Sequence, residues 1–366
     1  MTGSAAYDAI LLAGFGGPEG QDDVIPFLRN VTRGRGIPDE RLEAVATHYR
    51  HFGGVSPIND HNRQLKAAIE TELVARGIDL PVLWGNRNWA PFLNDAVVEA
   101  NQRGFTRLLG IVTSAYSSYS SCRQYREDFA RALAETGLDG TVHIDKVRQY
   151  FDHPGFVAPF IEGVRDAYAE FANRGINPDR VHVLFSTHSI PTDDAERSGP
   201  REIEFGPGGA YAAQHLAVAR VVMDAQEHPG TWELVYQSRS GAPSMPWLEP
   251  DINDAIAALD AEKVDAVVIV PLGFVSDHME VLWDLDTEAS QAARERGLEV
   301  IRVATPGIHH AFVAGLVDLV LERLDGTPDE NRPALTSLGP WYDVCRPACC
   351  ENIRAGFKPA VAGVAP

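Results

Sequence analysis

The chain has 366 residues, a length typical of two or three domains of about 150 residues each. Hydrophobic residues make up 45% and charged residues 23%, which is the mixture of a globular protein with a sizeable core. The 32 basic and 51 acidic side chains give a formal net charge of −19, and because such a surface repels polyphosphate we expect no nucleic-acid partner.

Short apolar runs alternate with helical patterns along the chain, which predicts parallel sheets connected by crossover helices. In chain order, the predicted strands are residues 9–12, 82–84, 108–112, 142–147, 181–185, 234–236, 266–270 and 300–303. The predicted helices are residues 38–49, 61–76, 155–173, 209–227, 279–296 and 310–324. Gly, Pro or polar loops bound the middle strands.

A weak internal repeat divides the chain. The run PFLNDAV precedes the strand 108–112, and the related run PWL…NDAI precedes the strand 266–270, with a polar loop and a helix after each strand. We therefore predict an α/β fold of two similar halves, residues 1–155 and 156–325, with a ligand cleft between them. Residues 326–366, rich in Pro and carrying three cysteines, form a C-terminal extension.

The turn after the first strand is rich in glycine. It reads GFGGP at residues 14–18, but Glu19 stands where a dinucleotide-binding fingerprint needs its third glycine, and Pro18 interrupts the start of a helix. The dinucleotide interpretation therefore fails. What remains is a tight turn where the backbone can approach a flat ligand closely, or a purely structural turn.

Two later strand ends carry polar groups suited to chemistry. His188 follows the strand 181–185, where an imidazole that titrates near neutrality suits proton transfer, although a structural role also fits. The strand 108–112 leads into a loop that includes Ser117 and Tyr119. Hydroxyls and aromatic rings in one loop suit carboxylate binding and stacking on a flat ring, or form a plain polar loop.

An acidic stripe begins beside His278. Glu280, Asp284 and Glu288 recur at a spacing that places them on one face of the predicted helix. Chance alone yields roughly one such triplet in a chain with 51 acidic residues among 366, so the position of this stripe at a strand end gives it weight. Imidazole and carboxylate together suit a divalent metal such as Fe(II).

These loops together resemble the ferrochelatase family. The matching stretches are GGVSP at 53–57, FSTHSIP at 185–191, YQSR at 236–239 with PWL at 246–248, and VSDHME at 275–280. The resemblance covers the chain to about residue 325. It implies two Rossmann-like halves, each with a four-stranded parallel sheet, around a porphyrin cleft, followed by the cysteine-bearing tail.

The resemblance also implies a role for each residue of the metal site. His188 and Glu280 correspond to the facing catalytic groups and would hold the Fe²⁺ substrate, with Asp277 and His278 as a supporting pair. Asp284 and Glu288 correspond to a stripe that delivers the metal. A porphyrin loses two pyrrole protons as a dication enters, so a base and a metal site must face one ring.

The porphyrin-binding residues implied by the resemblance are Phe15, Arg33, Arg35, Ser56, Arg87, Trp89, Ser117 and Tyr119. Phe15 stands where some members place a tyrosine under the metal. The segment 27–36 is a short, basic lip, whose Arg33 and Arg35 either pair with propionates or only solvate a loop. The resemblance to members with such a lip implies coproporphyrin III as substrate and Fe-coproporphyrin (coproheme) in haem biosynthesis as product.

Four alternatives to this reaction arise from the sequence. Protoporphyrin IX would be used if the lip did not select propionates, and a cobalt or nickel tetrapyrrole chelatase would keep His188 and Glu280. A non-catalytic porphyrin carrier would not need the acidic stripe. An oxidoreductase using the cysteines would need the dinucleotide turn that is absent.

The chain has four cysteines, Cys122, Cys345, Cys349 and Cys350. A 2Fe–2S cluster needs four thiolates, and actinobacterial ferrochelatases resemble this arrangement, with one ligand after the third strand and three in the tail. The C-x3-C-C spacing is tighter than the C-x2-C-x4-C of animal-type members. A four-cysteine zinc site and unligated thiols are the alternatives. We expect the cluster to be structural or regulatory.

The location and partners follow from these features. No apolar run reaches the roughly 18 residues of a membrane span, and residues 1–8 lack the basic start and apolar run of a signal peptide. We therefore predict a cytoplasmic protein without stable membrane insertion. We expect a monomer that makes at most transient contacts with neighbouring haem-pathway enzymes.

Overall fold

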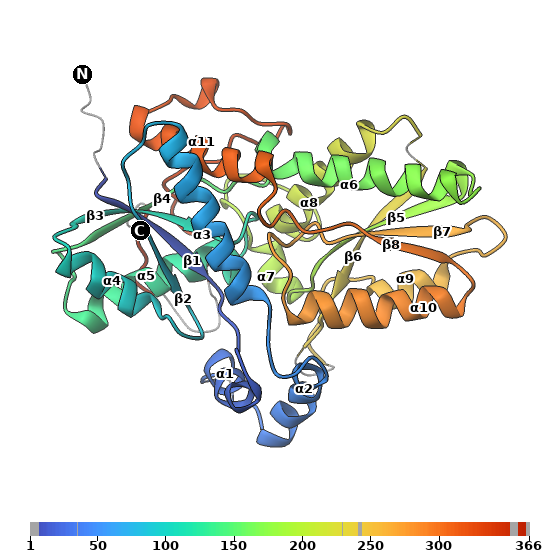
Figure 1. Ribbon diagram of the computed structural model, residues 1–366, viewed down its shortest axis with the longest axis horizontal. Coiled ribbons are helices and arrows are strands. Elements are labelled where there is room, and N and C mark those ends of the chain that lie inside the picture. Colours follow the sequence, from blue (N-terminus) through green and yellow to red (C-terminus); the bar gives the residue numbers. More distant parts are fainter. Residues whose placement is uncertain (1–6, 35, 229, 241–243, 352–357, 364–366) are drawn as a thin grey trace.

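The computed structural model describes residues 7–34, 36–228, 230–240, 244–351 and 358–363. Figure 1 shows two α/β halves side by side, each built on its own sheet. The first sheet has the order β2-β1-β3-β4 and the second has the order β6-β5-β7-β8, with every pairing parallel. The prediction of two four-stranded parallel sheets is therefore confirmed.

All eight predicted strands are present. Their bounds are Ala9–Gly14 (β1), Val82–Asn86 (β2), Arg107–Val112 (β3), His143–Lys146 (β4), Val181–His188 (β5), Thr231–Gln237 (β6), Ala266–Val270 (β7) and Glu299–Arg302 (β8). Every residue of the central strands β1 and β7 is buried. Strands covered on both faces need continuous apolar runs, which is why the sequence located them.

The α-helices are Val24–Val31 (α1), Asp39–His51 (α2), Ile58–Ala75 (α3), Leu93–Gln102 (α4), Gln124–Thr136 (α5), Pro154–Asn173 (α6), Thr192–Glu196 (α7), Gly209–Asp224 (α8), Ile252–Ala258 (α9), Ser290–Glu295 (α10) and His310–Asp325 (α11). The six predicted helices overlap α2, α3, α6, α8, α10 and α11. The helices α1 and α2 project together below the first sheet in Figure 1. Residues 27–31 of the segment predicted as a lip belong to α1.

One predicted helix has a different type. Residues 279–296 are predicted as one regular helix, but Val281–Ala289 forms a π-helix (η4) that continues into α10. Two side-chain hydroxyls bond within this π-helical segment. Thr287 Oγ1 donates to the carbonyl of Leu282 (3.0 Å), and Ser290 Oγ donates to the carbonyl of Leu285 (2.8 Å). Both bonds span five residues, the spacing of a π-helix, and π-segments often occur at functional sites.

The last helix ties the two halves together. Although α11 follows the second sheet in the chain, it packs against α3 of the first half as well as α6. Arg76 of α3 binds Asp318 of α11 (Nη1 to Oδ1, 2.5 Å) and donates to the carbonyl of Ala314 (3.3 Å). A continuous core therefore extends from Leu65 in the first half to Val183 in the second. The unit boundaries near residues 155 and 325 stay a prediction.

The described part of the C-terminal extension packs closely on the body. Leu335 donates its N–H to the carbonyl of Asp152 (2.9 Å), and Trp341 is only 4% exposed. Beneath it, buried Arg148 binds the carboxylates of Asp152 and Glu322 and the carbonyl of Pro333. Three partners compensate for burying this guanidinium, so the extension is anchored by a satisfied charge network.

Within the residues that the structure describes, no helix is both long and apolar enough to cross a bilayer.

Candidate functional site

His188 and Glu280 meet at the carboxyl edge of the second sheet. The strand β5 ends at His188, and its neighbour β7 leads through the 271–280 loop to Glu280. His188 Nε2 lies 3.6 Å from Glu280 Oε2. Both side chains are partly open, at 33% and 48% exposure, so they can reach a bound molecule. The sequence prediction that these two groups face each other is consistent with this geometry.

The ring of His188 is oriented by its own backbone. Nδ1 forms a short hydrogen bond to the carbonyl oxygen of Ser189, and because a carbonyl can only accept, the proton is on Nδ1. In that tautomer the lone pair is on Nε2, the atom that faces Glu280. A free Nε2 beside a carboxylate can bind a divalent metal or accept a proton.

Asp277 and His278 support the site in different ways. His278 Nδ1 accepts the backbone N–H of Glu280 (3.2 Å), and burial lowers the pKa of His278, so this ring is neutral and fixes the start of the helical segment. Asp277 instead forms a two-pronged pair with Arg302 (3.1 Å for each contact) and accepts from Thr305 Oγ1 (3.0 Å). Asp277 therefore anchors the loop to β8.

The acidic stripe continues along the π-helix. Ser238 Oγ donates to Asp284 in a short hydrogen bond, and Gln237 Nε2 donates to the same oxygen (3.3 Å). Burial, and then the neighbouring charge of Glu280, raises the pKa of Asp284 to about 7, with Glu288 adding to the shift. The charges of Glu280 and Glu288 both act on Asp284, so the three acidic residues lie close together and form one electrostatic unit.

Ser238 is a site residue that only the structure singles out. It adopts a left-handed backbone conformation (φ 61°), which is unfavourable for a residue other than glycine. The conformation places its hydroxyl on Asp284. Ser238 lies within the YQSR stretch that matched the family, which is the one signal that pointed to it.

The helix α2 reaches across to the acidic stripe. Tyr49 is 8% exposed, and besides burial the charges of Glu280 and Asp284 raise its pKa, so its ring lies beside these carboxylates. His48 stacks on Trp283 with ring centres 4.1 Å apart, and Trp283 Nε1 donates to Glu288 (2.9 Å). These aromatic residues were missed in the sequence because they resemble ordinary packing residues of amphipathic helices.

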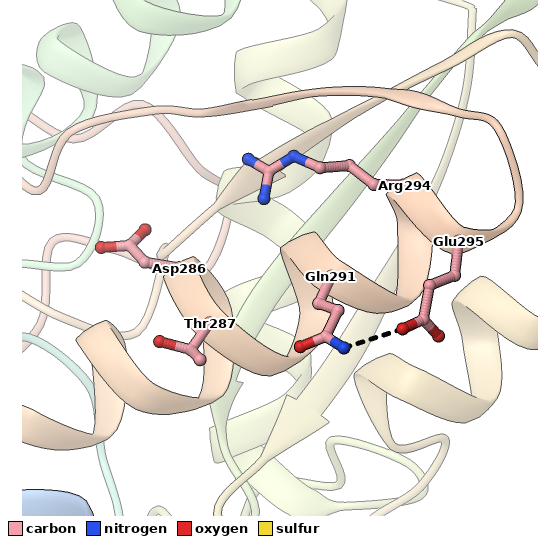
Figure 2. A pocket seen from close by; sticks show the side chains of 5 residues that line it. All are labelled: Asp286, Thr287, Gln291, Arg294 and Glu295. Atoms are coloured by element: carbon pink, nitrogen blue, oxygen red, sulfur yellow. Dashed lines mark hydrogen bonds between the residues drawn. The ribbon is translucent and has the colours of Figure 1, made fainter. Parts of the chain in front are cut away.

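A shallow pocket of about 450 Å³ lies along the same helical segment. Figure 2 shows the side chains that line it, which are Asp286, Thr287, Gln291, Arg294 and Glu295. Asp286 is engaged by Arg302 (Nε to Oδ1, 2.5 Å), and Gln291 donates to Glu295 (2.7 Å). The pocket contains none of the predicted site residues, so it is separate from the His188–Glu280 pair.

The four cysteines come together in one buried cluster, although Cys122 is distant in the sequence from the other three. Each is at most 2% exposed, and the sulfurs of Cys349 and Cys350 are 3.7 Å apart. Hydrogen bonds from Cys345 and Cys350 lower the pKa of Cys349. Among the described residues no group of three or more His, Cys, Asp or Glu side chains has the arrangement of a metal site as it stands. We call these four residues the thiol cluster.

The thiol cluster lies among donors and cations. Gly199 N–H donates to Cys350 Sγ (3.1 Å), and the Tyr342 hydroxyl lies 3.2 Å from Cys349 Sγ. Buried Lys146 and Arg126 are close enough to act electrostatically on Cys122. Donors and positive charges of this kind stabilise thiolates rather than thiols.

Comparison with known proteins identifies the family. A model of the ferrochelatase family matches residues 7–324. The chain is 70% identical to a coproporphyrin III ferrochelatase of Leifsonia xyli, over 100% of this chain and 96% of the relative. It is 54% identical to a coproporphyrin III ferrochelatase of Streptomyces griseus, over 98% of this chain and 96% of the relative.

The chain belongs to the ferrochelatase family. Among solved structures, SirB from Bacillus subtilis with Fe³⁺ has a TM-score of 0.51 at 12% identity, covering 90% of this chain and 100% of that one. At this identity the likeness concerns the fold alone, which is that of a chelatase. Family membership makes the protein a metal chelatase with Fe²⁺ as a substrate.

In this ferrochelatase, three predicted porphyrin-binding residues lie near one another on the first half. Phe15 is 37% exposed and meets the edge of Phe27 with ring centres 6.4 Å apart, and Trp89 lies 6.2 Å from the same ring. Arg87 lies 5.8 Å from the ring centre of Phe15 while its Nε binds Asp128. The aromatic rings of this cluster are suited to a flat ligand, whereas the Arg87 side chain is only 5% exposed and its charge is paired with Asp128.

Three other predicted porphyrin-binding residues, Ser56, Ser117 and Tyr119, are buried or engaged in hydrogen bonds within the protein. Ser56 is 4% exposed and packs against Gly17, where even a Cβ atom would come within 2.9 Å of its hydroxyl oxygen. Ser117 is fully buried and exchanges two hydrogen bonds with Gln214 of α8 (2.8 and 3.0 Å). Tyr119 donates to Glu127 (3.2 Å). Porphyrin binding stays a prediction for these three residues, as it does for Phe15, Arg87 and Trp89.

Of the two lip arginines, the structure describes Arg33. Arg33 is exposed and donates to Asn30 Oδ1 (2.7 Å), so its remaining N–H groups can meet an anion at the rim. Arg35 lies outside the described residues.

Proposed function

We propose that this ferrochelatase inserts ferrous iron into coproporphyrin III and releases coproheme in haem biosynthesis. The observation that carries the proposal is the pairing of His188 Nε2 with the Glu280 carboxylate in a chain so similar to relatives named for coproporphyrin III. The exposed basic lip supports the same substrate, because coproporphyrin III has four propionates and protoporphyrin IX has two.

The reaction requires that two pyrrole protons leave as one dication enters. Nε2 of His188 and the carboxylate of Glu280 face the same space, so they receive protons and bind the incoming iron from one side of the ring. His278 and Asp277 hold the loop that carries Glu280. A base and metal ligands that are already in place lower the cost of ordering them during the reaction.

Iron reaches this pair along Glu288 and Asp284. Replacing Asp284 by Asn or Glu288 by Gln should raise the KM for Fe²⁺ by roughly fivefold, because the loss of one charge from the stripe weakens its attraction for iron by up to about 1 kcal/mol, while kcat changes less than about twofold. Steady-state kinetics with varied iron under anaerobic conditions measures this. Glu295→Gln, on the separate pocket, is the matched control and should leave the KM unchanged. An equal loss of kcat in both stripe variants would contradict a delivery role.

Substrate choice is tested with the two porphyrins. The wild-type protein should favour coproporphyrin III over protoporphyrin IX by roughly tenfold to thirtyfold in kcat/KM, since two extra propionate pairs at the exposed lip contribute up to about 1 kcal/mol each. Anaerobic insertion assays with ferrous iron and each porphyrin provide the measurement. Arg33→Gln should reduce the ratio of kcat/KM for coproporphyrin III to that for protoporphyrin IX. Arg41 is an exposed arginine of α2, and Arg41→Gln should leave this ratio unchanged.

The same assay separates the alternatives. Equal use of both porphyrins would show that the lip does not select propionates. Faster insertion of cobalt or nickel than of iron would indicate a different chelatase. Porphyrin binding without any metal insertion would indicate a carrier and would overturn the proposal.

We also propose that the thiol cluster holds a 2Fe–2S cluster. The donor set fits, because four buried sulfurs are available, the Gly199 N–H already donates to one of them, and Lys146 and Arg126 offset the negative charge of bound thiolates. A bound cluster would supply a rigid link between Cys122 of the first half and the C-terminal extension. Zinc needs the same four thiolates, so metal analysis must distinguish the two.

For its setting, we propose a cytoplasmic monomer that touches neighbouring haem-pathway enzymes only transiently. The strongly acidic composition supports the absence of nucleic-acid binding.

A further inference from the structure

The thiol cluster is hydrogen-bonded to the second half as well as to the extension. Gly199 N–H donates to Cys350 Sγ (3.1 Å) from the loop that follows α7. The preceding residue, Ser198, is 3% exposed, and its hydroxyl donates to the carbonyl of Ala195 (2.5 Å) and accepts the backbone N–H of Tyr211 (2.8 Å). Cys350 is therefore joined to the first turn of α8 through two adjacent residues.

Tyr211 continues this connection to the catalytic strand. Its hydroxyl donates to the carbonyl oxygen of His188 (2.9 Å) and lies 2.8 Å from Thr187 Oγ1. The phenol is 6% exposed and Thr187 is 1% exposed, so water does not compete for these contacts. The backbone carbonyl of His188 is thus held by Tyr211 of α8.

The peptide between His188 and Ser189 determines where the catalytic ring points. Its carbonyl oxygen is held by Tyr211, and its N–H donates to the carbonyl of Gln237 (2.8 Å) on β6. The carbonyl oxygen of the next residue, Ser189, accepts the hydrogen bond from Nδ1–H of the His188 ring. A rotation of this peptide therefore moves the acceptor that orients the ring.

The intervening segment is packed too tightly to absorb a displacement. A Cβ atom on Gly199 would come within 2.7 Å of Ala210 Cβ, and one on Gly209 would come within 2.0 Å of the Ala195 carbonyl oxygen. Both glycines have positive φ angles, of 83° and 59°. Close-packed backbone transmits a shift instead of taking it up locally.

We infer that Tyr211 is a positioning residue for His188, and that it couples the orientation of the catalytic ring to the state of Cys350 through Ser198 and Gly199. The inference rests on the proposed chelatase reaction and goes beyond it, because it assigns the thiol cluster an effect on the active site. When Cys350 ligates a metal, Gly199 stays in place and Tyr211 holds the peptide of His188. When Cys350 is free to move, the peptide is released.

The first test removes only the phenol hydroxyl. Tyr211→Phe should lower kcat by about tenfold, since a misplacement of 1 Å costs up to a hundredfold, while the KM values for iron and porphyrin stay within about twofold. Tyr150→Phe is the matched control, because its buried hydroxyl also donates to a backbone carbonyl, that of Val112 (2.7 Å), in the other half. A similar kcat in both variants would overturn the positioning role.

The second test reads the coupling without turnover. In protein labelled with ¹⁵N-histidine, with the His188 signals assigned from His188→Gln, the change Cys350→Ser should shift the ring resonances of His188. The shift should disappear in the Tyr211→Phe background and persist in the Tyr150→Phe background. If Cys350→Ser does not fold, the His188 resonances are instead compared before and after a chelator removes the bound metal. An unchanged His188 spectrum in the wild-type background, or the same shift in all backgrounds, would overturn the coupling.

The two tests also separate this inference from the proposed function. A wild-type protein that inserts no iron contradicts the proposed reaction, yet its His188 resonances still report whether Tyr211 transmits the state of Cys350. A protein that inserts iron but shows additive losses of kcat in Tyr211→Phe and Cys350→Ser supports the reaction and refutes the coupling.

Discussion

His188→Ala is expected to abolish iron insertion while the variant still folds and binds coproporphyrin III. The substitution removes Nε2, which in the proposed reaction serves as the base and as one metal ligand beside Glu280, and general-base catalysis alone contributes about 10²–10⁴-fold. We expect kcat to fall by at least about a thousandfold, measured as coproheme formation under anaerobic conditions. Porphyrin binding, followed by fluorescence quenching, should stay within about threefold, because the aromatic surface around Phe15 and Trp89 is untouched.

Two variants frame this result. Glu280→Gln should be nearly as damaging, since it removes the other charged group of the pair. His143→Ala, which changes an exposed histidine at the start of β4 in the other half, should leave turnover unchanged. Near-normal turnover in His188→Ala would exclude the residue as a catalytic group.

Replacing Cys122 with Ala is expected both to prevent binding of the proposed 2Fe–2S cluster and to destabilise the protein. The wild-type protein should be red-brown when freshly purified, and its visible absorption should bleach with dithionite. These are the properties expected of a 2Fe–2S cluster held by four thiolates. The variant should be colourless. Its thermal midpoint should fall by at least about 5 °C, because a metal link worth several kcal/mol is lost and each kcal/mol corresponds to about 2–4 °C.

The control and the contrary outcome are both simple. Ser120→Ala alters an exposed residue two positions from Cys122 and should keep the colour and the midpoint. Cys345, Cys349 and Cys350 should each behave like Cys122, because all four sulfurs lie in one cluster. A colourless wild-type protein with one zinc and no acid-labile sulfide would refute the iron–sulfur proposal and favour a zinc site.

The sequence alone determined the architecture and the main chemical groups. The eight strands were predictable because parallel strands buried on both faces need apolar runs such as AVVIV at Ala266–Val270. Groups at the ends of adjacent strands, such as His188, were predictable because the carboxyl ends of parallel strands gather at one edge of a sheet. Glu280, Asp284 and Glu288 were predictable as a stripe from their spacing.

Only the tertiary structure decided how these groups are held. The π-helix was not predictable, since the spacing of four residues suits an α-helix and a π-helix alike, and the choice depends on packing against β6 and α2. The partner of Asp277 is Arg302, which lies 25 residues later on another strand. No local pattern carries such a pairing, because long-range contacts depend on sheet order.

The same reason explains what joins the distant parts of the chain. The thiol cluster unites Cys122 with residues more than 200 positions later, and α11 returns to the first half through Arg76 and Asp318. Tyr211 looks in the sequence like any aromatic residue on a buried helix face, and its hydroxyl gains a specific role only where α8 meets the end of β5. Side-chain types limit which bonds can form, but the folded backbone selects the partners because it sets which atoms come within reach.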